Sequence, residues 1–123
     1  MFKEYKSSGK HMICDFKGIQ NAKLLNNMFD LNKLLKDICV KYDFTILSEA
    51  AHQFEPFGCS ILFLLSESHI SVHTFPEKNH MSFDIYTCRQ YKNNDIYNEI
   101  FSSIAKKLDA LSVSTFKIID RYF

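Results

Sequence analysis

Two stretches of the chain repeat apolar side chains at every third or fourth position, and this spacing constrains the fold most. In residues 30–42 leucine, isoleucine and tyrosine recur on one side, with Asp30 as the expected N-cap. Residues 94–111 carry a second apolar stripe. A period near 3.6 residues predicts an amphipathic helix at each place. Because such a helix is apolar on one face, the rest of the chain must supply a surface for both helices to cover.

Segments with strand-like patterns account for most of the remaining chain. We expect strands at residues 11–17, 45–54, 60–65, 69–75, 81–88 and 113–119. Residues 81–88 alternate between polar and apolar, whereas residues 60–65 are almost continuously apolar and should be buried on both faces. The order β-α-β-β-β-β-α-β predicts an α+β fold, a two-layer sandwich in which a mainly antiparallel sheet carries both helices on one face.

The second face of the predicted sheet has no helix to cover it. The strands nevertheless carry apolar residues on both sides. The economical solution is a homodimer that packs two open sheet faces together, which gives a four-layer αββα assembly. Residues 1–10 have no sustained period and are expected to form a tail or an arm.

The composition is that of a globular chain with a single domain, residues 1–123. Fifteen Lys and Arg against 14 Asp and Glu leave a formal charge of +1, which offers no broad surface to nucleic acid or to an anionic membrane. Without an 18-residue apolar run or a signal-peptide pattern, we expect a soluble, cytoplasmic protein with no nucleic-acid or membrane partner. The cysteines form no C-x-x-C pair, and Cys14, Cys39 and Cys59 are expected to be small buried side chains.

The densest set of reactive side chains lies in the middle of the chain. Residues 67–77 read E-S-H-I-S-V-H-T-F-P-E, and residues 84–88 read D-I-Y-T-C. Upstream stand G-K-H at 9–11 and H-Q-F-E-P-F-G at 52–58. In this order the motifs resemble those of the prokaryotic S-adenosylmethionine decarboxylase proenzymes, small pyruvoyl enzymes of polyamine synthesis. The resemblance in motifs runs from residue 9 to residue 88. Beyond it, the second predicted helix and the last predicted strand match the family only in the type of element.

Decarboxylation of an amino acid needs an electron sink that no ordinary side chain provides. The carboxylate leaves as CO₂ only if the remaining electron pair is delocalised, and a carbonyl that condenses with the amine supplies that sink. The sequence shows no evident glycine loop for a phosphate-bearing cofactor. A carbonyl made in place from a serine would meet the need.

The resemblance implies that Ser68 becomes this carbonyl. Its hydroxyl would attack the carbonyl of Glu67, and the resulting ester would eliminate and hydrolyse. The products would be a β chain, residues 1–67, and an α chain, residues 68–123, that begins with a covalently bound pyruvoyl group. His73 matches the family histidine that moves protons during this cleavage, a role suited to a side chain that titrates near neutrality.

The same resemblance assigns the other site residues for the substrate S-adenosylmethionine. Cys88 matches the cysteine that returns a proton to the substrate's α-carbon, and a free thiol is mostly protonated near neutrality. Ser60 matches a serine that assists processing. Phe54 and Phe75 match rings that stack on adenine, and Glu77 matches the acid that binds the ribose hydroxyls. Phenylalanine at position 75 departs from the family's common tryptophan.

Plainer interpretations compete with these assignments. Ser68 alone would be a turn serine, and His69 is expected to be mainly structural. A zinc site of His69, His73, His80 and Cys88 can be drawn, but no spacing signature supports it, and we expect no metal. Strict alternation places Ser68 and His73 on opposite faces unless a turn, a bulge or a partner subunit intervenes.

Two other functions stay open. The same mechanism could act on ornithine or arginine, for which adenine stacking is unnecessary. An uncleaved, inactive homologue could instead serve as a binding or regulatory subunit, although Ser68, His73 and Cys88 are all retained.

Overall fold

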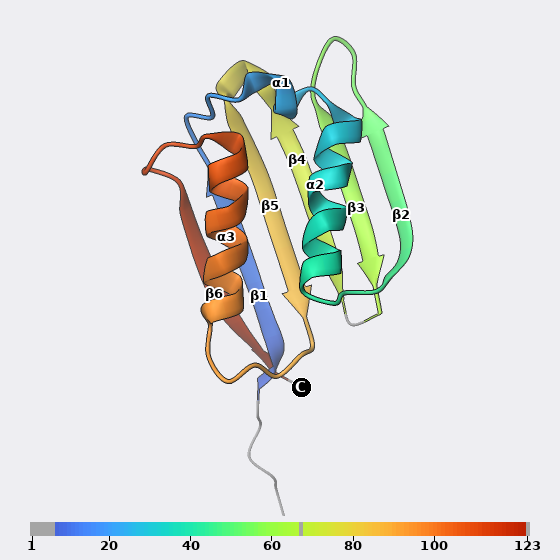
Figure 1. The fold of residues 1–123 in the computed structure, drawn as a ribbon, viewed down its shortest axis with the longest axis vertical. Coiled ribbons are helices and arrows are strands. Elements are labelled where there is room, and N and C mark those ends of the chain that lie inside the picture. Colours follow the sequence, from blue (N-terminus) through green and yellow to red (C-terminus); the bar gives the residue numbers. More distant parts are fainter. Residues whose placement is uncertain (1–6, 67, 123) are drawn as a thin grey trace, which may run out of the picture.

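The computed structural model describes residues 7–66 and 68–122, and its elements are shown in Figure 1. The strands are β1 (Ser7–Phe16), β2 (Ile46–Gln53), β3 (Cys59–Leu65), β4 (His69–Phe75), β5 (His80–Thr87) and β6 (Thr115–Tyr122). The helices are α1 (Ala22–Leu25), α2 (Met28–Lys41) and α3 (Asp95–Leu108), with the 3-10 turn η1 (Pro76–Lys78).

The strands form one sheet in the order β2-β3-β4-β5-β1-β6, and every neighbouring pair is antiparallel. The first strand therefore lies between β5 and β6. Helices α2 and α3 cover the same face of this sheet (Figure 1). The predicted α+β architecture is confirmed, with α1 and η1 as additions that are too short to show a helical repeat in the sequence. Within the described ranges, no helix is long and apolar enough to cross a membrane.

Two predicted boundaries are wrong. The first strand begins at Ser7, so residues 7–10 belong to the sheet and not to a tail, while residues 1–6 of that predicted tail lie outside the described residues. Asn27, not Asp30, is the N-cap of α2, and its side chain accepts a hydrogen bond of 3.0 Å from the Asp30 N–H. Asp30 instead lies in the first helical turn, where the helix dipole favours a negative charge.

The core lies between the two long helices and the sheet face that they cover. Strand β5 alternates as predicted, with positions 81, 83, 85 and 87 buried. The expectation for Cys14, Cys39 and Cys59 is confirmed, since all three are buried and free. Burial raises the pKa of Cys14 to about 12 and that of Cys39 to about 11. These thiols therefore stay protonated at neutral pH and pack as small apolar side chains.

The other sheet face, called the open face below, has apolar flanks and a polar centre. The prediction that residues 60–65 are buried on both faces is wrong, because β3 alternates between buried and exposed positions and, among the described residues, no helix covers the open face. Leu62 and Leu64 are 48% and 54% exposed. Ile13 and Ile119, on the opposite flank, are 41% and 42% exposed. Between these flanks, β4 and β5 present serine, histidine and aspartate side chains.

Candidate active site

Ser68 and Cys88 meet at the end of the sheet where the hairpin of β3 and β4 turns. The Leu65 N–H donates to the Ser68 carbonyl at 2.9 Å, and the Ser68 N–H donates to the Leu65 carbonyl at 3.3 Å, which closes the hairpin. Cys88 directly follows β5, and its Sγ lies 3.8 Å from Ser68 Oγ. Ser68 is thus part of a turn, so strand alternation does not apply to it. Glu67 lies outside the described residues.

Ser60 and His73 form a second group, toward the other ends of β3 and β4. The two residues are register partners across these strands, and Ser60 Oγ lies 2.7 Å from His73 Nδ1. Which group donates depends on the tautomer of the imidazole. The pair has the hydroxyl-to-imidazole contact that proton transfer requires.

A pocket of about 370 Å³ opens beside this second group. It is lined by Phe54, Phe57, Gly58, Ser60, His73, Thr74, Phe75 and Glu77. Phe54 and Phe75 are 46% and 38% exposed, so they are surface rings and not core aromatics. The structure therefore brings the three residues predicted to bind substrate, with Ser60 and His73, to one pocket. The structure also places Phe57 in this pocket. Phe57 lies within the motif at 52–58, but no feature of the sequence distinguishes it as a site residue.

A single chain keeps the two groups apart. His73 lies four residues beyond His69 on β4, a separation of about 13 Å at roughly 3.3 Å per residue. Ser68 precedes His69, so the Ser68–Cys88 group is at the opposite end of the strand from the Ser60–His73 pair. This distance also means that His69 and His73 cannot share a zinc ion, since zinc ligands lie about 2 Å from the metal.

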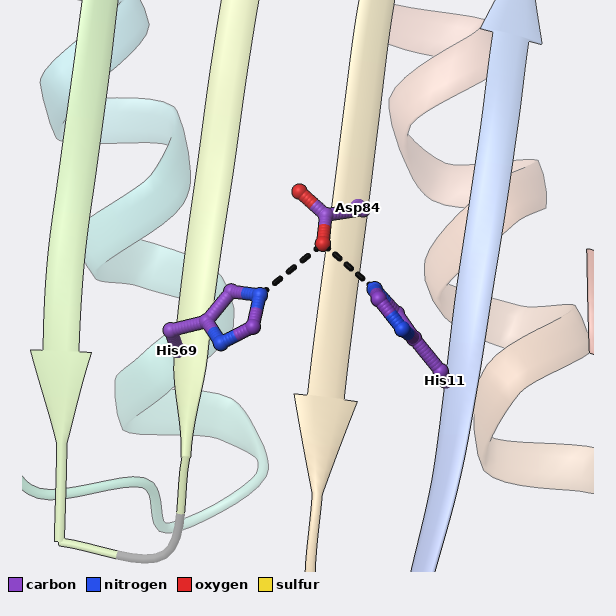
Figure 2. Close-up of side chains that lie close together, drawn as sticks. All are labelled: His11, His69 and Asp84. Carbon is purple, nitrogen blue, oxygen red and sulfur yellow. Dashed lines mark hydrogen bonds and ion pairs between the residues drawn. The ribbon is translucent and has the colours of Figure 1, made fainter. Parts of the chain in front are cut away.

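Three side chains that the sequence does not predict as a set converge on the open face (Figure 2). His11 Nε2 lies 2.5 Å, and His69 Nε2 2.9 Å, from the same oxygen of Asp84, Oδ2. Ser71 donates to Asp84 Oδ1, and Arg121 Nη1 lies 3.2 Å from His11 Nδ1. His11, His69 and Asp84 all stand in the quoted motifs, but only the pairing of β1 and β4 with β5 shows that they are neighbours.

Comparisons with known proteins agree on one family. A profile of the family described as S-adenosylmethionine decarboxylase matches residues 10–121. The S-adenosylmethionine decarboxylase proenzyme 2 of Bacillus cereus is 38% identical over 103 residues, which are 84% of this chain and 83% of that protein. The corresponding proenzyme of Thermoplasma volcanium is 38% identical over 112 residues, which are 90% of this chain and 82% of that protein.

A solved structure gives the same result for the fold. The crystal structure of the adenosylmethionine decarboxylase from Aquifex aeolicus superimposes with a TM-score of 0.82 at 26% sequence identity. The match covers 96% of this chain and 93% of that chain.

Proposed function

The chain belongs to the S-adenosylmethionine decarboxylase family, and we propose that it is a self-processing, pyruvoyl-dependent enzyme that converts S-adenosylmethionine to S-adenosylmethioninamine and CO₂. The 3.8 Å approach of Ser68 Oγ to Cys88 Sγ carries this proposal, because it pairs the precursor of a carbonyl with a proton donor. The product is the aminopropyl donor for spermidine-type polyamines.

Self-cleavage starts with Ser68. Its hydroxyl attacks the carbonyl carbon of Glu67, and an ester replaces the peptide bond between the two residues. Loss of the Ser68 α-proton breaks the ester, which frees the carboxylate of residues 1–67. Hydrolysis of the remaining enamine-type end then releases ammonia and leaves residues 68–123 with a pyruvoyl start. The hairpin supports the attack because two backbone hydrogen bonds with Leu65 fix Ser68 at the turn.

A pyruvoyl group at position 68 is compatible with the surroundings of Ser68. The group keeps the three carbons of the serine, so it needs no more room than the side chain and backbone already occupy. Its formation removes the Ser68 N–H, whose bond to Leu65 is the longer of the two at 3.3 Å. When present, a pyruvoyl group supplies the sink for the electron pair left by CO₂. Cys88 then returns a proton to the substrate's α-carbon.

The pocket beside His73 supports a nucleoside substrate. Its volume of about 370 Å³ lies in the range of small-molecule sites. The exposed rings of Phe54 and Phe75 can stack on an adenine, which is worth about 1–3 kcal/mol per base in nucleic-acid systems. Glu77, on the same wall, can accept hydrogen bonds from ribose hydroxyls. The aromatic faces also attract the positive sulfonium of S-adenosylmethionine.

A homodimer explains why the two groups lie toward opposite ends of β4 in one chain. In the proposed assembly, two chains pack their open faces together about a two-fold axis, with their strands running in opposite directions. The Ser68–Cys88 group of one chain then meets the Ser60–His73 pair and pocket of its partner. The apolar flanks of the open face become buried, and the assembly has the four layers αββα.

In this assembly His73 handles the protons of self-cleavage. An imidazole can take the proton of the attacking hydroxyl and give it to the leaving nitrogen, because its ring nitrogens can each accept or donate a proton. The contact with Ser60 at 2.7 Å fixes the orientation of the ring. Each dimer has two such sites, and each site uses both chains.

The denatured intact mass of the purified protein tests the proposal before any substrate is added. Wild type should yield two chains divided between Glu67 and Ser68, and the carboxy-terminal chain should be lighter than its serine form by one ammonia. The Ser68→Ala control should remain one chain. A folded wild-type protein that remains a single chain of unmodified mass would overturn the proposal and favour a binding or regulatory homologue.

A further inference from the structure

The cluster of His11, His69 and Asp84 lies outside the residues assigned so far, although one member is covalently joined to the cleavage site. His69 follows Ser68 directly, and its ring points to Asp84 on the neighbouring strand β5 (Figure 2). The Asp84 side chain is only 20% exposed, whereas that of Asp15, another carboxylate of the open face, is 50% exposed. The cluster is therefore a hydrogen-bonded unit beside the turn, with its carboxylate partly buried.

The hydrogen bonds of the cluster fix the positions of its protons. A guanidinium can only donate, so Arg121 donates to His11 Nδ1, and that nitrogen carries no proton. The proton of the neutral ring must then be on Nε2, from which it is donated to Asp84 Oδ2 at 2.5 Å. His69 Nε2 donates to the same oxygen, and Ser71 donates to the other. Asp84 thus accepts three hydrogen bonds.

The same proton positions disfavour a metal ion in this cluster. A metal bound to His11 Nε2 needs the lone pair of that nitrogen, but the contact with Arg121 leaves the proton there. The cluster is better suited to holding side chains in place than to holding a cation.

We propose that Asp84 is a positioning residue for self-cleavage, which fixes His69 and, through His69, fixes Ser68. This inference rests on the self-cleavage proposed above. Attack by a side-chain hydroxyl requires a near-attack geometry, and a misplacement of about 1 Å can lower a rate roughly 100-fold. The turn itself is anchored on the β3 side by Leu65, and the hydrogen bonds of Asp84 anchor it on the β4 side.

The rate of self-cleavage of newly synthesised precursor tests this role. Precursor made by cell-free translation would be sampled over time and assayed by denatured mass. Asp84→Asn keeps the shape but loses the charge, and it should slow cleavage at least tenfold. Asp15→Asn is the matched control, because it removes a carboxylate from the same face, and it should cleave within twofold of wild type. Equal rates for Asp84→Asn and wild type would overturn the inference.

A second pair of variants separates positioning from folding. The side-chain amide of glutamine can reach Asp84 as a donor, so His69→Gln should cleave several-fold faster than His69→Ala, and equal rates would count against the inference. The ¹⁵N spectrum of imidazole-labelled protein should show His11 protonated at Nε2 and not at Nδ1, whereas a deprotonated Nε2 would contradict the arrangement. Failure of wild type itself to cleave would refute the proposed function, an outcome distinct from any difference among variants.

Discussion

Ser68→Ala and His73→Ala, two variants that should each be inactive, are expected to restore activity when their chains share a dimer. In a mixed dimer, one site receives the intact Ser68–Cys88 group from the His73→Ala chain and the intact His73 from the Ser68→Ala chain. The other site lacks both groups. Purified mixed dimers should therefore have about half of wild-type activity, because one site in two is complete. Random pairing of equal amounts should give about a quarter, since only half of the dimers are mixed.

The assay uses two chains with different affinity tags, expressed together so that they pair before cleavage. Mixed dimers are purified through both tags and assayed for CO₂ release from labelled S-adenosylmethionine. Denatured mass gives a second readout, because the His73→Ala chain should be cleaved only in the mixed dimer. The Ser68→Ala chain should stay intact in every combination.

The matched control combines Ser68→Ala with Cys88→Ala. Both changes lie in the same group, whose atoms are 3.8 Å apart in one chain, so no combination of these chains contains a complete site. This pair should show no recovery. The two-chain site would be refuted if mixed dimers of the first pair form but stay inactive, or if both pairs recover equally.

Other expected outcomes concern the pocket, the thiols and one close backbone contact. Phe75→Ala should raise the KM for S-adenosylmethionine about tenfold, since a stacked ring is worth about 1–3 kcal/mol, while Phe75→Trp should not; steady-state kinetics measure both. Iodoacetamide should alkylate Cys88 in the native protein and the three buried cysteines only after unfolding, as peptide mass mapping would show. Burial raises the pKa of the Cys14 thiol from 9.0 to about 12, so the free energy of unfolding should fall as the pH rises from about 9 toward 12. Urea titrations should show a smaller fall for Cys14→Ala. Gly9→Ala should lower the melting temperature, because φ is +150° there and an added Cβ would lie 1.9 Å from the Thr87 carbonyl oxygen.

Local patterns predict the fold where one rule dominates. Strand β4 matches its predicted bounds because alternation is strict over His69–Phe75 and a proline follows it. The predicted N-cap of α2 is wrong because Asn27 and Asp30 are both good capping residues, and only the hydrogen bond seen in the structure distinguishes them. The short helix α1 has a single turn, which is too little for a periodic signal.

Residue types and motif order predict the members of the site but not their arrangement. Alternation places side chains on a face, yet it does not say which strands are neighbours. The insertion of β1 between β5 and β6 is a long-range pairing, so the contact between His11 and Asp84 could not be predicted. The predicted bounds of the strands at 60–65 and 69–75 place the turn at residues 66–68, but they do not show that Ser68 Oγ lies beside Cys88 Sγ.

The position of β1 has a consequence for the protein after cleavage. The bond between residues 67 and 68 would divide the sheet, leaving β1, β2 and β3 in one chain and β4, β5 and β6 in the other. Because the sheet order is β2-β3-β4-β5-β1-β6, the two chains interleave, and β1 of the first is held on both sides by strands of the second. The two chains should separate only by unfolding together. That unfolding would separate the two chains of every protomer, so the melting temperature of the mature protein should rise with its concentration more steeply than that of the uncleaved Ser68→Ala protein.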